Sequence, residues 1–264
     1  MKGIFSIVTV AAASGLALAQ DAVNSTVPQQ AEAAPAAPAP AETSGGSFSF
    51  KNFMLDEDIS FFDLGSNDIT LFNTRLSWEL EDRVDINLNL PVYTNGDTGL
   101  GMVGIGLDFA AIKSPTTWID AVTIGTGVEL PAASDDFGGD SINTKLGAGV
   151  HGKTGVDKLS WCAGVDGTFV SDATFLPVFG GLVFDDVFHL GGGLHYNWCD
   201  GVNVALKYNY WDVDSAGSIS TLGPTFNFDL CPSAKFEAGF DVPVSDDDAS
   251  ELDLVVRAGF NVKF

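Results

Sequence analysis

Regular alternation between apolar and polar residues restricts the fold of this 264-residue chain more than any other feature. From about Asn67 to the C-terminus, runs of roughly 10 to 14 residues carry an apolar side chain at every second position. Successive side chains of a β-strand leave opposite faces of the sheet, so a period of two predicts strands. The clearest runs are ITLFNTRLSWEL, RVDINLNLPVY, KLSWCAGVDGTFV, GVNVALKYNYW and KFEAGFDVPV.

Short segments rich in Gly, Asn, Asp, Ser and Pro separate these runs, and such residues favour chain reversals. Examples are TNGDTG, AASDDFGGD, KTGVD and CPSA. No helical period lies between the runs, which predicts an antiparallel meander rather than strands that alternate with helices. Residues 67–264 therefore contain about 12 strands, within a range of about 10 to 14.

The length of the runs distinguishes a soluble sheet from a membrane barrel. Strands of soluble proteins are usually about 5 or 6 residues long, whereas a tilted membrane-spanning strand needs about 9 to 11. The runs repeatedly reach the second length, and the non-apolar face is rich in Gly, Asn, Asp and Thr. We therefore expect the apolar faces to contact lipid and the polar faces to enclose a lumen. Aromatic residues near the run ends are expected to form interfacial girdles: Trp78, Trp118, Trp161, Trp198, Tyr208, Tyr210, Trp211 and Phe264.

The chain ends on ELDLVVRAGFNVKF, in which Val256, Ala258, Phe260, Val262 and Phe264 occupy every second position. This segment resembles the last strand of bacterial outer-membrane β-barrel proteins of the porin-like kind, which typically ends on an aromatic residue. The resemblance implies an all-β, transmembrane, antiparallel up-and-down β-barrel in the bacterial outer membrane, with its last strand closed against its first. It also implies that Phe260, Val262 and Phe264 form the signal that the barrel-assembly machinery reads.

The N-terminal residues precede the repeated pattern. Residues 1–19 combine a basic start, a short apolar core and a small-x-small site at Ala17–Ala19, which predicts a cleaved signal peptide. Residues 20–46 are rich in Ala and Pro and predict an extended linker. Residues 47–66 form an aromatic and acidic lead-in, for which an extra strand, an amphipathic segment and a segment at the barrel mouth are all open. The expected barrel covers residues 67–264.

Charge excludes one class of partner and suggests another. The chain has 12 Lys+Arg against 35 Asp+Glu, a net charge of −23, so little of it can neutralise nucleic-acid phosphates. An acidic lumen indicates a weak preference for cations or neutral polar solutes. Asp253 and Arg257 are candidates for ion pairs with Glu237 and Asp241 on the preceding strand. The residues expected to line the lumen are Arg75, Glu79, Asp85, Asp108, Glu129, Lys145, Asp166, His189, His195, Lys207, Asp229, Glu237, Asp241, Asp253 and Arg257.

Catalysis and metal binding have little support in the sequence. Barrel phospholipases and lipid A deacylases place a histidine two residues before a serine, whereas VHGK, FHLG and LHYN have Lys, Gly or Asn there. His189 and His195 are six residues apart on one strand, about 20 Å, which is too far to share one ion. We therefore expect no enzymatic activity, no cofactor and no metal. The sequence does not determine whether its cysteines, Cys162, Cys199 and Cys231, form a disulfide. A Cys199–Cys231 disulfide and three free thiols are both open.

The expected function is passive diffusion of small hydrophilic solutes through a porin-like channel with a weak cation preference. The alternatives are a plugged structural or surface-interaction barrel, then a lipid-modifying barrel enzyme or a secreted soluble β protein. The expected partners are outer-membrane lipid, the assembly machinery, and small polar solutes or cations; the oligomeric state is open.

Loop positions fit the resemblance poorly. In related barrels the long loops lie outside the cell and the short turns face the periplasm. A count back from Phe264 puts AASDDFGGD and TNGDTG on the periplasmic side. Either all loops are short, or the count slips near residues 47–66 or in TFLPVFGGLVF, which is apolar on both faces.

Overall fold

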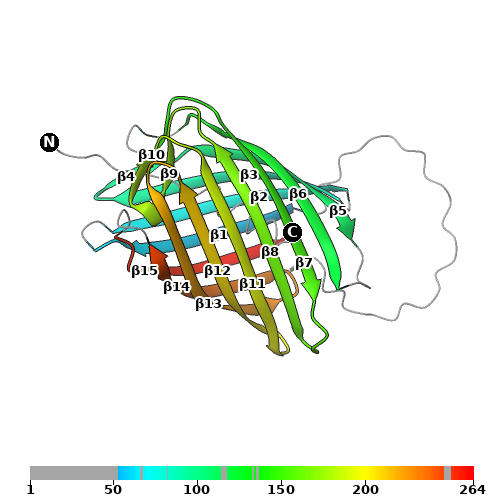
Figure 1. Cartoon of the computed structure of the whole chain (residues 1–264). Coiled ribbons are helices and arrows are strands. Elements are labelled where there is room, and N and C mark those ends of the chain that lie inside the picture. Colours follow the sequence, from blue (N-terminus) through cyan, green and yellow to red (C-terminus); the bar gives the residue numbers. More distant parts are fainter. Residues whose placement is uncertain are drawn as a thin grey trace, which may run out of the picture.

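The computed structural model describes residues 53–65, 68–81, 83–113, 118–132, 134, 137–246 and 251–264. In these residues, twelve strands form the wall of a closed antiparallel barrel (Figure 1). The wall strands are β1 (Phe53–Asp63), β2 (Ile69–Glu81), β3 (Val84–Asn95), β5 (Val103–Lys113), β6 (Ile119–Leu130), β7 (Asn143–Lys153), β8 (Leu159–Phe169), β11 (Val187–Cys199), β12 (Val202–Val213), β13 (Gly217–Cys231), β14 (Ala234–Asp246) and β15 (Leu254–Lys263). Three further short strands are β4 (Asp97–Leu100), β9 (Thr174–Leu176) and β10 (Gly181–Val183), and the 3-10 turn η1 (Pro177–Phe179) joins β9 to β10.

The first and last strands close the barrel. Met54 of β1 lies opposite Lys263 of β15, and Asp63 lies opposite Leu254. The barrel thus begins at Phe53 and not at residue 67, and an extra strand is what residues 53–63 form. The run Asp56-Glu57-Asp58 interrupts the apolar period of β1, which is why the sequence did not predict this strand. The predicted signal peptide and linker lie outside the described residues, and within the described part of the chain no helix is long and apolar enough to cross a membrane.

The two ends of the barrel differ in their connections. At the terminal end, where Phe264 N donates to Phe53 O at 2.8 Å, short turns join the strands. The opposite end, which we call the loop end, carries β4, β9 and β10 (Figure 1). TNGDTG and AASDDFGGD also join their strands at the loop end, so their expected position on the side of Phe264 is wrong. The strand count slipped at TFLPVFGGLVF, because this segment folds as β9, η1 and β10 and returns to the same end.

Apolar side chains cover the outside of the barrel. Phe260 is 51% exposed and Leu206 is 48% exposed, whereas Asp241 and Asn209 on the other face are each 1% exposed. The prediction that the apolar faces point outward is therefore confirmed. Near the terminal end, Phe53 contacts the rings of Trp78 and Phe264 at centroid distances of 5.4 and 5.6 Å, which places an aromatic girdle there.

Three residues depart from this pattern. Trp211, expected in a girdle, lies inside the barrel because it follows Asn209 by two residues and shares its inward face. Leu252, which continues the apolar spacing of the last strand, is also buried inside; it precedes β15 at the loop end. Conversely, Glu57 is exposed, and its carboxylate accepts a hydrogen bond of 2.9 Å from Thr74 Oγ1.

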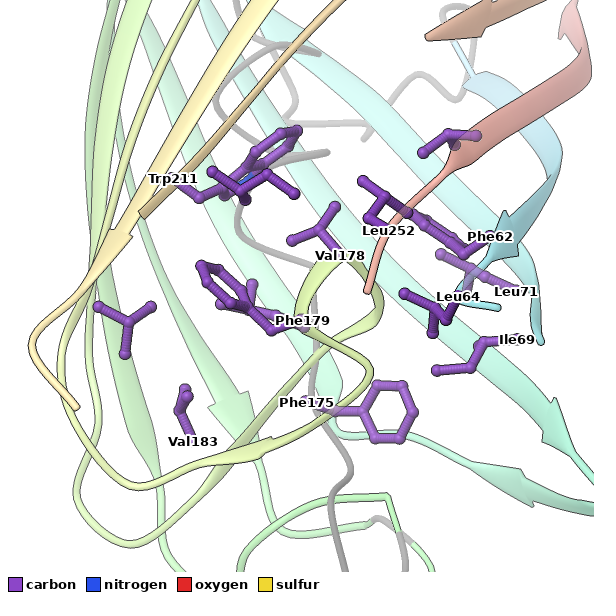
Figure 2. Packing of buried hydrophobic residues seen from close by; sticks show 14 of the residues in the cluster. Phe62, Leu64, Ile69, Leu71, Phe175, Val178, Phe179, Val183, Trp211 and Leu252 are labelled. Atoms are coloured by element: carbon purple, nitrogen blue, oxygen red, sulfur yellow. The ribbon is translucent and has the colours of Figure 1, made fainter. Parts of the chain in front are cut away.

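An apolar cluster fills the barrel at the loop end. Its centre is residues 174–183, which we call the stopper, with Phe175, Leu176, Val178, Phe179 and Val183 buried. The stopper reverses direction at Gly180, whose φ of 69° lies in the left-handed region. After this turn, β10 pairs antiparallel with β9. The surrounding side chains come from wall strands and their connections: Phe62, Leu64, Ile69, Leu71, Tyr93, Phe137, Val187, Trp211, Val213, Ile219, Leu252 and Val255. Figure 2 labels six of them around the stopper: Phe62, Leu64, Ile69, Leu71, Trp211 and Leu252.

Candidate functional site

The inner face of the barrel is polar between the stopper and the terminal end. A strand of period two that shows lipid an apolar face must turn its polar residues inward, so every wall strand contributes to this face. The buried polar residues include Asn73, Asn87, Asn89, Glu129, Asn143, Lys145, Asp166, His189, His195, Lys207, Asn209, Thr221 and Asp241. Because burial of a charge is costly unless it is paired, the contacts of these residues define the site.

One polar cluster attaches the stopper to the wall. Lys145 Nζ lies 2.5 Å from Glu129 Oε1, and Glu129 Oε2 accepts a hydrogen bond of 3.0 Å from Thr174 Oγ1 of the stopper. Asn143 Nδ2 donates to Glu129 Oε2 at 3.3 Å and to the Ala173 carbonyl at 3.1 Å. We call Glu129, Asn143, Lys145 and Thr174 the latch. Glu129 and Lys145 were expected at the lumen. Thr174 was not, because it lies 45 positions from Glu129 and no local pattern connects the two.

Two histidines of the inner face pair with aspartates. His189 Nδ1 lies 2.7 Å from Asp166 Oδ2, and its ring stacks on Trp211 at a centroid distance of 5.1 Å. His151 contacts Asp120, a pair that the list of expected lumen residues did not include. An ionised carboxylate only accepts hydrogen bonds, so in each pair the imidazole Nδ1 is the protonated nitrogen.

Basic side chains also meet acids across the strands. Arg257 contacts Asp241, which is one of the ion pairs expected from the sequence. Lys207 Nζ lies 2.9 Å from Glu237 Oε1, so this pair links β12 to β14. Each of these pairs joins one base to one carboxylate.

Arg75 and Asp108 form a looser pair through an amide. Arg75 Nη2 lies 3.7 Å from Asp108 Oδ2. Asn87 Oδ1 accepts hydrogen bonds from Arg75 at 3.0 Å and from Ser77 at 2.7 Å, while its Nδ2 donates to Asp108. Asn87 was not among the expected site residues, although it lies on the polar face of its run.

The remaining expected residues lie toward the two openings. Glu79 and Asp85 are half-buried opposite each other near the terminal end. Asp229 is exposed there, with Lys235 Nζ at 3.7 Å. Asp253 is exposed at the loop end and makes no predicted pair with Glu237 or Asp241, because Leu252 and Val255 turn inward instead.

A cysteine thiol lies beside a histidine on the inner face. Cys162 Sγ lies 3.3 Å from His195 Nε2, and both residues are buried on the inner face. The search for a serine two residues after a histidine therefore missed a thiol beside His195. Sequence spacing could not reveal this contact, because the two residues are 33 positions apart on β8 and β11. The pair faces the lumen and not the lipid, so it is poorly placed to act on membrane lipids.

The cysteines and acidic groups form no further centre. Cys162, Cys199 and Cys231 are all free thiols, so the disulfide left open by the sequence does not form. Within the described ranges, no three His, Cys, Asp or Glu residues are arranged to hold a metal ion.

Glycines occupy several inward positions on one side of the wall. They lie opposite one another on successive strands, from β5 through β11. The register pairs Gly106 with Gly127, Gly125 with Gly147, Gly149 with Gly164, and Gly164 with Gly191. At these positions no side chain projects into the lumen.

Comparison with known proteins identifies the fold. No protein-family model and no curated relative matches the chain. The COG4313 outer membrane channel from Pseudomonas putida F1 has a TM-score of 0.63 and 12% identity, over 84% of this chain and 100% of that one. The NanC porin has a TM-score of 0.58 and 11% identity, over 80% of this chain and 100% of that one. The KdgM porin in complex with disordered oligogalacturonate has a TM-score of 0.55 and 12% identity, over 80% of this chain and 99% of that one.

Identities this low show the fold alone. The chain has the fold of bacterial outer-membrane β-barrel porins and channels, and its apolar exterior matches that membrane.

Proposed function

We propose that this chain is an outer-membrane channel through which small hydrophilic solutes diffuse passively. The observation that carries the proposal is a polar, ion-paired inner face enclosed by an apolar exterior. A barrel that only anchors a protein in the membrane has no need of so many charged groups inside. The shared fold with proteins described as porins and channels supports the same role.

A weak cation preference follows from the terminal end of the lumen. Asp56, Asp58, Glu79 and Asp85 have inward positions in this half, while the bases Arg75, Lys207 and Arg257 are neutralised by carboxylate partners. Carboxylates in excess of basic groups at a pore entrance attract cations and repel anions. Multivalent anions are the solutes that this entrance disfavours most.

The stopper favours a second candidate function, a plugged barrel without transport. Its apolar side chains fill the loop end, and hydrated solutes do not cross a packed apolar layer. Under the channel proposal, conduction therefore requires residues 174–183 to move away from the wall.

Single-channel recording distinguishes the two candidates. The refolded chain is placed in a planar bilayer with a KCl gradient, beside a variant whose residues 174–183 are replaced by a Gly/Ser linker of equal length. We expect brief openings in the native chain, larger and longer ones in the variant, and a reversal potential of the sign for K⁺ in both. No conductance in either protein refutes the channel, and an anion-selective reversal potential refutes the cation preference.

The same proposal includes orientation and assembly. If the assembly machinery reads Phe260, Val262 and Phe264, the terminal end faces the periplasm and the stopper faces the outside of the cell. Deletion of Phe264 is expected to reduce the folded, heat-modifiable fraction in cell envelopes. An unchanged fraction contradicts the assembly role.

We also propose that the chain is not an enzyme, and that the Cys162–His195 pair is part of the lumen wall. Cys162→Ser is expected to leave conductance within about twofold of the native value, because the hydroxyl keeps a polar group beside His195.

A further inference from the structure

One acidic side chain lies on the lipid-facing surface of the barrel. Glu57 is exposed on the outer face of β1, on the same face as the exposed apolar residues Ile59 and Phe61. Among the described residues, no other outward side chain at this depth of the wall is acidic or basic. Hydrocarbon solvates a carboxyl group poorly, so Glu57 is a costly residue at this position unless a polar group covers it.

Glu57 lies near the middle of the apolar band. It follows Phe53, which belongs to the aromatic girdle at the terminal end, by four residues. A strand rises about 3.3 Å per residue and tilts by about 40° in such barrels, which places Glu57 about 10 Å from that girdle. The apolar band of an outer-membrane barrel is about 25 Å tall, so the lipid headgroups are beyond the reach of this side chain.

Thr74 on β2 satisfies only part of the Glu57 carboxyl group. The two residues lie directly opposite each other, and Thr74 Oγ1 donates to Glu57 Oε2 at 2.9 Å. No described residue bonds to Glu57 Oε1. In the protonated form of a carboxyl group this second oxygen has a hydrogen to donate, and the Thr74 hydroxyl keeps a lone pair that can accept one.

The Glu57–Thr74 pair is complementary to itself. Two copies that cross one bilayer in the same orientation hold these residues at the same depth. A two-fold axis normal to the membrane, between β1 and β2, sets Glu57 of each copy against Thr74 of the other. Each Thr74 then donates within its own chain and accepts from Glu57 of the second copy, so both oxygens of each carboxyl group have a partner.

Apolar side chains surround the pair. Ile59, Phe72 and Phe260 border it and are 48%, 44% and 51% exposed. Lipid tails are as apolar as these side chains, so apolar packing alone gives little preference for a protein neighbour. The hydrogen bonds at the centre of this surface therefore decide whether two copies associate.

We propose that the surface formed by Glu57, Thr74, Ile59, Phe72 and Phe260, which we call the β1 face, joins two copies of the chain into a dimer within the membrane. The two reciprocal hydrogen bonds between Glu57 and Thr74 specify the partner. The dimer does not depend on conduction, so it can be tested separately from the channel.

Sedimentation equilibrium in density-matched detergent micelles measures the association. The refolded full chain, with its folding checked by heat-modifiable migration, is compared with Glu57→Leu. Thr126→Leu is the matched control, because Thr126 is also exposed on the outer face but lies on β6, four strands around the wall from β1. We expect a dissociation constant that is about tenfold or more higher in Glu57→Leu, since both reciprocal bonds are lost, and unchanged in Thr126→Leu.

Cysteine crosslinking in lipid vesicles tests which surface makes the contact. In a chain whose three free cysteines are replaced by serine, Ile59→Cys keeps Glu57 and adds a thiol to the β1 face, while Ile124→Cys adds one to the exposed outer face of β6. With a short bifunctional thiol reagent, we expect a dimer band from Ile59→Cys that is several times stronger than the band from Ile124→Cys. A native chain that stays monomeric, a Glu57→Leu variant that dimerises as tightly as the native chain, or equal crosslinking at the two positions overturns the proposal.

Discussion

The loop-end half and the terminal half of the barrel share one wall but differ in what the wall encloses. In the loop-end half, the inward side chains of Ile69, Leu71 and Val213 are apolar and pack on the stopper. In the terminal half, the inward positions carry Arg75, Asn87 and other polar groups that bond to one another. Lipid acts on the outer face along the full length of a strand, and so the outer pattern is the same in both halves.

The difference shows how to interpret a strand that is apolar on both faces. Phe61 of β1 is exposed to the lipid side, while its neighbour Phe62 is buried against the stopper cluster. Consecutive apolar residues in a membrane barrel therefore mark the height at which protein, and not water, fills the interior. The same reasoning explains TFLPVFGGLVF, which is apolar throughout because protein surrounds it.

The largest expected effect comes from the latch. Lys145→Met leaves the Glu129 carboxylate buried without its cation, which is expected to lower the free energy of unfolding by about 3 to 5 kcal/mol. Urea titration of the protein in lipid vesicles, followed by tryptophan fluorescence, measures this change. The control is Lys235→Met, whose exposed pair with Asp229 in the terminal half contributes about 0 to 1 kcal/mol. Equal effects of the two substitutions contradict the special role of the latch.

A smaller loss is expected from the stopper core. Phe175→Ala removes a ring that stacks on Tyr93 at a centroid distance of 4.0 Å and leaves a cavity, at a cost of about 3 kcal/mol. Phe240→Ala on the outer face is expected to cost less, about 2 kcal/mol, because it loses the transfer of the ring from water to hydrocarbon but leaves no cavity, since lipid chains fill the space. The same urea titration compares the two variants. If Phe240→Ala is the more damaging, the loop-end half is not held by its apolar interior.

The smallest change in stability, with a clear change in selectivity, is expected in the terminal half. Arg257→Gln removes the base that contacts Asp241; since the Arg257 side chain is 29% exposed, solvent screens the loss to about 1 to 2 kcal/mol. The freed carboxylate is expected to shift the reversal potential further toward K⁺. Asp241→Asn is the opposite change and is expected to shift it toward Cl⁻. A shift of the same sign in both variants contradicts a charge effect at this pair.

Much of the fold followed from residue order alone. Period two and run length predicted an antiparallel barrel of about 12 strands with its apolar faces outward. The proximity of Arg257 and Asp241 was also predictable, because residues on one face of neighbouring strands can interact diagonally; the register places Asp241 opposite Val255 and Arg257 opposite Gly239. The first strand was left as one of three alternatives for residues 47–66, because three acidic residues in a row hide its period.

The candidate site was predictable only in part. The polar face identified Asp166, His189 and Lys207 as inward residues, but their partners come from strands that the sequence does not align. Cys162 beside His195 and Thr174 beside Glu129 depend on register and on the path of the stopper, neither of which has a local signal.

For the strands from Ile69 onward, the sequence by itself determined which side contacts lipid, since hydrocarbon accepts only apolar side chains wherever the strand crosses it. Tertiary structure alone decided that residues 174–183 fold into the barrel and which inward groups meet. Those contacts depend on strand register and on free space inside the closed wall, and both exist only after the barrel has closed.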